Sequence, residues 1–381
     1  MPEPISQPHA TASFIKALQQ MPDPRDNRGK RHRLSFVLAA VAIAIMAGRA
    51  RVSAIQRYVQ QQIVWLREIT GQPDAQPISR AQLPRILAVV DWAELNTLLE
   101  SHLGMRLEQT ADGEWTALDG KTLRGTEDCT ERTLLAVGHT SRQTVAQQPM
   151  TGPKESEIAA ARELLHETGL EKGRVTLDAL HLNPTTTAQI AQAGGTYVIQ
   201  VKDNQAELKA QLQAWAAQAE VVGSVTTTDK GRGRVETRHG TFVPLAGLAL
   251  AERWAQSGLE TLLVIERHTL EAAKSKSTTD ISYYVSNQRV APGGAVVQRS
   301  LFDAVRRHWG IEAGNYIRDV TFHEDAVKTK DGNQGQVLAC LRTLATGLLR
   351  QAKIKNFQAA LENFGDSLPT FKAFLEQVQF L

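Results

Sequence analysis

The sequence predicts an α/β protein in which an all-α N-terminal region precedes a mixed sheet flanked by helices. From Phe14 to about Leu103, apolar residues recur at spacings of three and four, and no strand pattern interrupts them. Beyond Glu114, short apolar runs alternate with helical segments in the order β-β-β-α-β-α-β, which suits a sheet covered by helices. The 381 residues are enough for a full core and for two or three domains.

The composition is that of a mildly basic globular protein. The chain has 43 Lys and Arg against 40 Asp and Glu, which permits a nucleic-acid partner without requiring one. Its two cysteines, Cys129 and Cys340, are too few for a disulfide framework. The longest apolar run, 36–48, is too short to cross a bilayer, and no convincing cleavage site follows it. We therefore expect a cytoplasmic protein with no membrane partner.

The N-terminal region is predicted to be a bundle of helices over 14–105. Residues 1–13 are polar and proline-rich, so we expect a disordered tail there. Ser79 is placed to cap a helix, and Pro84 must lie in the first turn of that helix or kink it. The strongest helical segments are 34–47, 52–70, 80–90 and 92–103.

The remaining chain is predicted to alternate between strands and helices. Strands are expected at 114–120, 133–140, 143–150, 173–181 and 196–204, with helices at 154–169 and 185–195. A β-rich stretch follows, with hairpins over 223–245 and strands at 261–270 and 281–287. Helices resume at 298–317, 335–353 and 356–364.

Two aspartates stand at matching places in this series. Asp119 ends the first strand, and Asp178 ends the fourth. If those strands are neighbours, the two carboxylates emerge side by side, as Mg²⁺ or Mn²⁺ requires. A metal pair held there supports in-line phosphoryl displacement. Strand-end aspartates also serve as turn or cap residues, but two in matching positions favour the metal site.

A third carboxylate is expected from the helix that contains Glu312. On helical spacing Glu312 shares a face with His308, Trp309, Tyr316 and Asp319. This face is polar and aromatic, where a purely structural helix would present aliphatic side chains. A solvated surface glutamate is the alternative interpretation. On chemistry alone Asp303, Asp319 and Glu324 remain rival third ligands.

The motifs in this order resemble the insertion-sequence transposases of the ISAs type, the H-repeat-associated proteins. The similar stretches are WTALDGKTLRGT around Asp119, KESEI, RVTLDALH around Asp178, YVIQVKDNQ, HWGIE and RDVTFHEDA. The stretch that begins at residue 23 resembles the associated domain that precedes the nuclease in that family. The resemblance runs from about residue 14 to about residue 350.

This resemblance implies a DDE transposase with a ribonuclease-H-like catalytic domain. Asp119, Asp178 and Glu312 would be its catalytic residues and would hold two Mg²⁺ or Mn²⁺ ions. The catalytic domain would span 112–355, with a β-rich insertion at about 204–281, and 356–381 would form a helical tail. The implied partner is double-stranded DNA, both terminal inverted repeats and target, bound by a homodimer.

The chain also departs from the family pattern. Ala313 follows the glutamate where the family has Asn, Asn315-Tyr316 replaces a Leu-His pair, and Asp203 stands in KDNQ where Gly is usual. A domesticated or inactive relative that only binds DNA therefore stays open. So does a host nuclease with the same fold.

Basic side chains predict contacts with DNA phosphates in several places, each of which can also be a solvated surface. We interpret Trp309 as a core residue, and His181, Cys129 and Cys340 as structural. His308 is either a ligand of the phosphate or a packed residue. The predicted DNA contacts are Arg25, Arg28, Lys30, Arg31 and Arg33 in the basic stretch 22–33; Arg80 and Arg85 on a candidate recognition helix; Lys230, Arg232, Arg234 and Arg238 in a glycine-rich hairpin; and Lys121, Arg124, Lys202, Arg306, Arg307 and His308 near the carboxylates.

Overall fold

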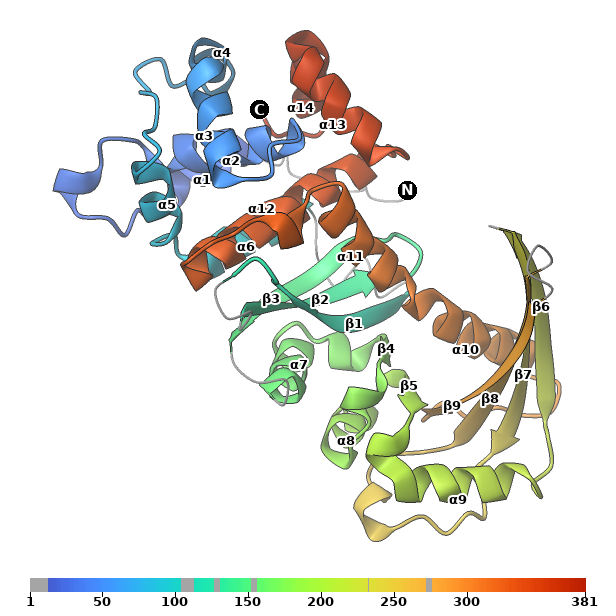
Figure 1. The fold of residues 1–381 in the computed structure, drawn as a ribbon. Coiled ribbons are helices and arrows are strands. Elements are labelled where there is room, and N and C mark those ends of the chain that lie inside the picture. The colour runs from blue at the N-terminus through green and yellow to red at the C-terminus, as the bar shows by residue number, and fades with distance from the viewer. Residues whose placement is uncertain (1–12, 104–112, 127–130, 152–155, 232, 272–275) are drawn as a thin grey trace, which may run out of the picture.

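A mixed sheet of nine strands runs through the protein in the order β3-β2-β1-β4-β5-β9-β8-β7-β6 (Figure 1). The computed structural model describes residues 13–103, 113–126, 131–151, 156–231, 233–271 and 276–381. β1, β4 and β5 are parallel to one another, and the remaining neighbours pair antiparallel. The strands are β1 (Trp115–Thr122), β2 (Glu131–Gly138), β3 (Thr144–Thr151), β4 (Arg174–Leu177), β5 (Thr196–Val201), β6 (Gly223–Gly231), β7 (Arg234–Pro244), β8 (Thr261–Glu271) and β9 (Lys276–Ser286).

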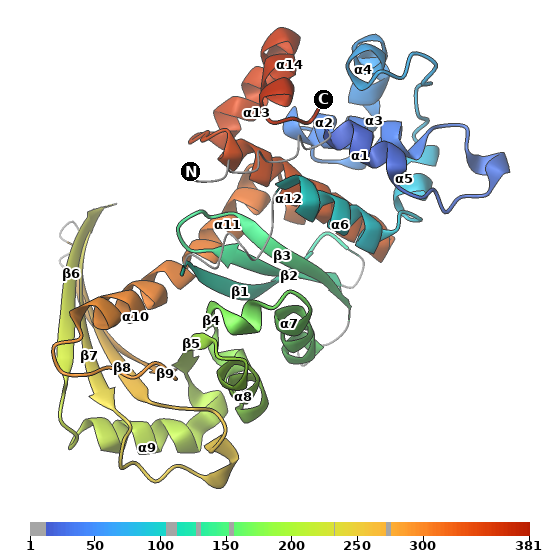
Figure 2. The same cartoon turned by 180° about the vertical axis from the view of Figure 1, so that it is seen from behind.

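Helices cover both faces of the central strands. α7 and α8 lie on one face, and α11 and α12 lie on the other, as the two opposite views show (Figures 1 and 2). α10 leads from the curved β6–β9 end of the sheet towards α11 (Figure 1). The helices are α1 (Phe14–Gln20), α2 (Leu34–Met46), α3 (Val52–Gln61), α4 (Ile63–Thr70), α5 (Gln82–Leu87), α6 (Trp92–Leu103), α7 (Ser156–Glu167), α8 (Pro184–Gln192), α9 (Ala206–Ala216), α10 (Ala295–His308), α11 (Gly310–Val320), α12 (Gly332–Gln351), α13 (Phe357–Asp366) and α14 (Leu368–Gln377).

The N-terminal and C-terminal helices share one hydrophobic core. α2 is apolar all round and every one of its residues is buried, as expected for a helix at the centre of such a core. α12 is also buried over most of its length, and α13 and α14 add a cluster of phenylalanines to the same core. The end of the chain therefore stabilises the region in which it begins.

Most of the expected elements are confirmed, including the adjacency of the first and fourth strands and the position of Pro84 in the first turn of α5. Three of these predictions need correction. The helix expected at 52–70 is divided between α3 and α4 at Gln62. α9 lies at the start of the stretch of about 204–281 that was expected to be β-rich, and the single helix expected at 298–317 is divided between α10 and α11 at Trp309. No helix among the described residues is long and apolar enough to cross a membrane. The predicted tail, apart from Ser13, lies outside the described residues, as do Cys129 and Arg232.

Candidate active site

Asp119 and Asp178 lie side by side because β1 and β4 are parallel neighbours in register. Leu118 pairs with Leu177, so the next residue of each chain segment is an aspartate. β1 continues beyond Asp119 to Thr122, which corrects the expectation that this aspartate ends its strand. Both carboxylates border a pocket of about 120 Å³, and Glu312 lies on its rim.

The electrostatics of this pocket are dominated by negative charge. Burial, together with the carboxylates of Asp178 and Glu157, raises the pKa of Asp119 to about 7 against the opposing influence of the Gly120 amide and His181. Asp178 accepts a hydrogen bond from the Leu180 amide at 2.9 Å, as the cap of a short 3-10 helix. Hard carboxylate oxygens that repel one another at close range are a suitable donor set for a divalent cation.

Glu312 reaches the pocket from the first turn of α11, where its side chain is exposed. Among the residues that the structure describes, no group of three His, Cys, Asp or Glu side chains is close enough to hold one ion. The two aspartates are therefore the carboxylates that the structure brings together, and Glu312 borders the same pocket without forming a group of three with them.

The rival third ligands are engaged elsewhere. Asp303 pairs with Arg299 at 3.0 Å on the surface of α10. Asp319 and Glu324 are bound by the cations of a buried network, described below. Glu312 is the carboxylate among these four that borders the pocket.

Glu157 and His181 also belong to this site, although the sequence reasoning gave neither a role in it. His181 is fully buried, and neither ring nitrogen has a hydrogen-bond partner among the described residues. Its Nε2 lies 3.6 Å from Glu157 Oε1 and 3.9 Å from Asp178 Oδ1. Glu157 was visible in the KESEI motif, but only the fold brings α7 beneath β1.

Gly120 leaves the space that Glu157 occupies. A Cβ built on Gly120 would lie 2.6 Å from the carboxyl carbon of Glu157, closer than two carbons can approach. The glycine after Asp119 therefore lets an acidic side chain of α7 approach the aspartate.

His308 and Trp309 border the same pocket. Burial lowers the pKa of His308 to about 4, although Asp178 opposes this shift. Its Nδ1 lies 2.9 Å from Thr176 Oγ1, which also contacts His139 Nε2 at 2.9 Å. Trp309 is 51% exposed, so its prediction as a core residue was wrong.

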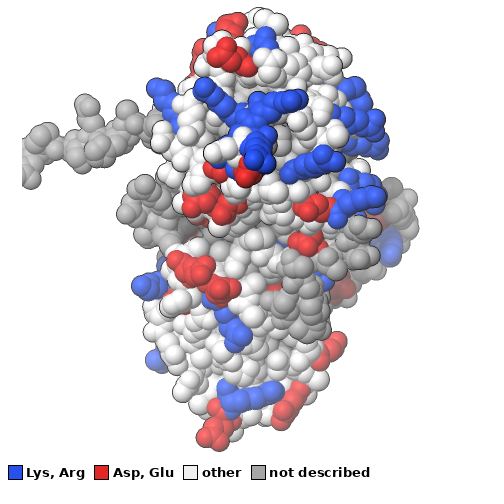
Figure 3. Space-filling model, turned by 90° about the vertical axis from the view of Figure 1, so that its left-hand side faces the viewer, with Lys and Arg blue, Asp and Glu red and all other residues white. Residues whose placement is uncertain are grey.

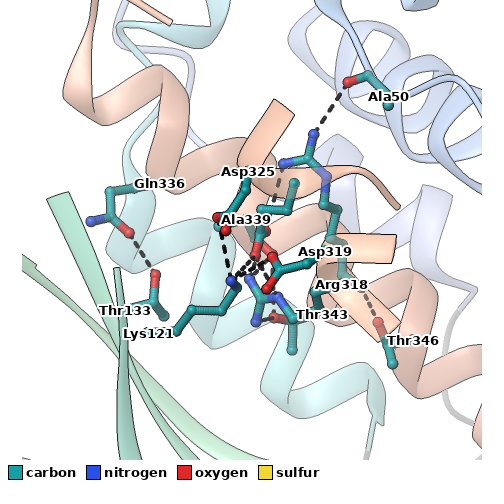
Figure 4. Close-up of polar contacts among 12 residues, drawn as sticks. Ala50, Lys121, Thr133, Arg318, Asp319, Asp325, Gln336, Ala339, Thr343 and Thr346 are labelled. Atoms are coloured by element: carbon teal, nitrogen blue, oxygen red, sulfur yellow. Dashed lines mark hydrogen bonds and ion pairs between the residues drawn. The ribbon is translucent and has the colours of Figure 1, made fainter. Parts of the chain in front are cut away.

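Lys121 lies beneath α11 and is bound by carboxylates (Figure 4). Its Nζ is 2.6 Å from Asp319, 3.5 Å from Asp325 and 3.8 Å from Glu324. Only 6% of the Lys121 side chain is exposed. The expected contact between Lys121 and a DNA phosphate therefore has no support here, because three carboxylates already occupy the ammonium group.

Two arginines complete this network. Arg318 Nε and Nη2 each donate to Glu324 at 2.9 Å, and Arg342 Nη1 lies 3.6 Å from the same carboxylate. Arg342 also donates to the Ala50 carbonyl at 3.2 Å (Figure 4). The network joins β1, α11 and α12 to the N-terminal helices and so fixes the far end of the helix that carries Glu312.

The basic stretch before α2 lies on the surface, with one exception. Arg25 donates to both oxygens of Asp23 and to the His32 carbonyl, so it is a structural residue where a DNA contact was expected. Figure 3 shows Lys and Arg side chains gathered on this side of the N-terminal helices. The exposed basic residues here are Arg28, Lys30, Arg31, Arg33, Arg80 and Arg85, which we call the N-terminal basic surface.

The other predicted DNA contacts differ in their exposure to solvent and in whether an acidic side chain already pairs with them. Arg238 and Arg306 both pair with Asp229, at 3.1 and 2.7 Å, and Arg234 pairs with Glu236 at 2.8 Å. Arg124 is 76% exposed and lies 3.7 Å from Asp325. Lys202, Lys230 and Arg307 are exposed.

Comparison with known families agrees with this fold. The transposase DDE domain model matches residues 102–348, and the DDE_Tnp_1-associated model matches residues 15–103. The chain therefore belongs to the transposase DDE domain family.

Curated relatives extend along almost the whole chain. "Putative transposase YncI" of Escherichia coli O157:H7 is 25% identical over 90% of this chain and 88% of its own length. "H repeat-associated putative transposase YhhI" of Escherichia coli (strain K12) is 24% identical over 91% of this chain and 92% of its own length. The similarity thus covers both the helical and the sheet-containing regions.

Proposed function

We propose that this protein is a metal-dependent DNA transposase that cuts DNA at the terminal inverted repeats of its element and joins the ends to target DNA. The observation that carries the proposal is the pair Asp119 and Asp178 on adjacent parallel strands, with Glu312 on the rim of the same pocket. The strand order β3-β2-β1-β4-β5 and the flanking helices favour a ribonuclease-H-like catalytic domain.

The domain layout that we propose follows the sequence expectation. Residues 14–105 would form the associated helical domain, 112–355 the catalytic domain and 356–381 a helical tail. The β-rich segment of about 204–281 would be an insertion in the catalytic domain. This division is supported by the boundary between the two family matches near residue 102.

In the proposed mechanism Asp119 and Asp178 would hold the ions, and Glu312 would complete the ligand set after moving closer. Mg²⁺ or Mn²⁺, when bound, would activate a water or 3′-hydroxyl nucleophile and stabilise the leaving oxygen. The neutral His308 ring, held by Thr176, offers a hydrogen-bonding group at the pocket without adding charge. Lys202 would bind the phosphate next to the carboxylates.

DNA recognition is assigned to exposed cations. The N-terminal basic surface would hold the DNA electrostatically, and Lys230 and Arg234 would extend that contact along the β6–β7 hairpin. Arg124, Arg306 and Arg307 would contact phosphates closer to the pocket. Because an element has two ends, we expect a homodimer on DNA.

The decisive experiment is a cleavage assay on labelled duplexes that carry the inverted repeats flanking the gene. We expect 3′-hydroxyl ends in Mg²⁺ or Mn²⁺ and none with EDTA. Asp119→Asn and Asp178→Asn should lose about 10³-fold or more of the rate, as the removal of several kcal/mol of charge stabilisation requires. Asp74→Asn, an exposed aspartate in a remote loop, is the matched control.

Three results would favour other functions. Binding to the repeats without nicking under any divalent ion indicates a retired, DNA-binding relative. Equal cleavage of duplexes with and without the repeats indicates a host nuclease. Full activity of Asp119→Asn would remove the carboxylate site from the mechanism.

A further inference from the structure

Three arginines from separate elements surround the junction between α10 and α11. Arg142 lies in the turn between β2 and β3, Arg307 near the end of α10, and Arg350 at the end of α12. Arg142 Nη1 donates to the Arg307 carbonyl at 3.4 Å, and Arg307 Nη1 donates to Thr140 Oγ1 at 2.9 Å. The turn between β2 and β3 thus holds the end of α10.

The guanidinium groups lie along the glycines of α11. A Cβ on Gly310 would fall 1.1 Å from Arg142 Nη1, and a Cβ on Gly314 would fall 3.4 Å from Arg350 Nη2. Arg142 also adopts a φ of 59°, in the left-handed region that residues with a side chain seldom occupy. Backbone strain of this kind is concentrated at functional positions.

The positive charges of this cluster are not balanced. Burial lowers the pKa of Arg142, Arg307 lowers it further, and Glu114 only partly opposes them. Burial together with Arg142 lowers the pKa of Arg350 to about 10. Within the described part of the chain, no carboxylate forms an ion pair with any of the three arginines. Like charges gathered at a partly buried surface create a potential that attracts an anion.

Glu114, the acidic residue that partly opposes the charge of Arg142, is hydrogen-bonded to backbone amides. Glu114 accepts hydrogen bonds from the amides of Thr140 and Ser141, the latter at 2.7 Å. It therefore shapes the turn that carries Arg142. A phosphate oxygen is a suitable missing partner, because guanidinium groups bind phosphates through parallel N–H donors.

We propose that Arg142, Arg307 and Arg350 form a binding site for a phosphodiester group of DNA, on the face of α11 opposite Glu312. The nature of the ligand rests on the proposed function. At about 100° per residue, Gly310 and Gly314 lie on nearly one side of α11, and Glu312 lies on the opposite side. The helix diameter of about 10 Å separates the two faces, so a strand crossing the junction at Trp309 passes both sites.

The site is tested by the salt dependence of DNA binding. Fluorescence anisotropy in EDTA is measured on a duplex carrying the inverted repeat, over a range of salt concentrations. Arg142→Gln, Arg307→Gln and Arg350→Gln should each weaken binding about tenfold and reduce the slope of log K against log salt by about 0.9. Arg142→Lys should restore most of that slope because it keeps the charge.

Arg253→Gln is the matched control. Arg253 is an exposed arginine that pairs with Glu207 beyond the opposite edge of the central sheet, so the slope should not change. Inorganic phosphate at low salt should also raise the thermal midpoint of the wild type more than that of Arg142→Gln. This second measurement separates loss of the anion from a folding defect.

Each outcome decides a different claim. If all three glutamine variants keep the slope of Arg253→Gln, the arginine site is refuted, whether or not the protein cleaves DNA. If the slopes fall but no cleavage occurs in Mg²⁺ or Mn²⁺, the site stands and the proposed catalytic function fails. A wild-type protein that binds no DNA refutes both.

Discussion

Two clusters of charged side chains include residues of β1, one around Asp119 and one around Lys121. They differ in whether positive and negative charges are present in equal number. Asp119 borders the pocket, and burial together with the charges of Asp178 and Glu157 raises its pKa. Lys121, two residues later and on the same face of the strand, belongs to a network in which three cations meet three carboxylates. One cluster is self-repelling and the other is balanced.

We interpret the balanced cluster as structural and, on the proposed function, the unbalanced cluster as the site of the reaction. In the network, Glu324 is nearly inaccessible, yet Arg318 binds it with two hydrogen bonds and holds its charged form. Next to Asp119, Arg132 lies 3.7 Å from Glu157, and His181 has no hydrogen-bond partner among the described residues. Unmatched buried charge persists where a ligand provides the missing partner, whereas matched charge needs none.

The largest change in stability is expected when one carboxylate is removed from the balanced network around Lys121. Glu324→Gln should lower the free energy of unfolding by about 3–5 kcal/mol, because it leaves Arg318 and Arg342 buried without their counter-charge. Chemical denaturation measures this. Glu68→Gln, in the exposed pair with Lys372, should cost less than about 1 kcal/mol. Equal losses for the two variants would mean that the network contributes no more than a surface pair.

Removing the charge of Asp119 is expected to stabilise the protein, whereas removing the charge of Glu324 destabilises it. In protein freed of metal by EDTA at pH 8, Asp119→Asn should raise the free energy of unfolding by about 3 kcal/mol, since it removes a buried charge whose pKa is shifted from 3.8 to about 7. The measurement is a thermal or urea transition, with Asp74→Asn as the control. A destabilised Asp119→Asn protein would show that the aspartate is structural.

The sequence predicted the strands of the sheet better than it predicted the residues of the candidate site. β1, β4 and β5 were predictable because their apolar runs are buried on both faces, and this placed Asp119 beside Asp178 once the strands were taken as neighbours. Glu157 was not predictable as a site residue, because only the packing of α7 against the sheet brings it near. Its motif carried information, but no spacing relation connects it to Asp119.

Helical periodicity in the sequence also failed to predict the break between α10 and α11. The run 298–317 has helical periodicity throughout, yet α10 ends at His308 and α11 begins at Gly310. Trp309, which we had interpreted as a core residue, lies at that break and is exposed. Lys121 and Arg25 were interpreted as DNA contacts from charge alone. The partners of Lys121, Asp319 and Asp325, are distant in the sequence, whereas Asp23, the partner of Arg25, is only two residues away.

The two clusters should respond to pH with opposite slopes. The raised pKa of Asp119 means that the folded state binds more protons than the unfolded state between pH 4 and 7, so stability falls as pH rises through that range. Burial alone would raise the pKa of Glu324, but Arg318 and Arg342 outweigh it and lower that pKa below 4.5. The network's contribution is therefore lost as pH falls below that value.

We expect metal-free protein to be most stable near pH 5 and to lose about 2 kcal/mol between pH 5 and pH 7. Denaturation at closely spaced pH values tests this. In Asp119→Asn the loss above pH 5 should disappear, while the loss below pH 4.5 remains. If the wild type and Asp119→Asn have parallel profiles, another group is responsible for the slope.

The smallest effect concerns the contact that brings Glu157 to the pocket. Gly120→Ala should lower the free energy of unfolding by about 1–2 kcal/mol, because the new methyl group overlaps the Glu157 carboxylate, whose flexible end can partly withdraw. Gly231→Ala, at a position with open space, should be neutral or slightly stabilising. A double-mutant cycle isolates the contact: with Glu157→Ala in place, Gly120→Ala should cost almost nothing. If the cost of Gly120→Ala is the same with and without the Glu157 carboxylate, strain elsewhere in β1 explains it, and the glycine does not control how closely the acidic side chain approaches Asp119.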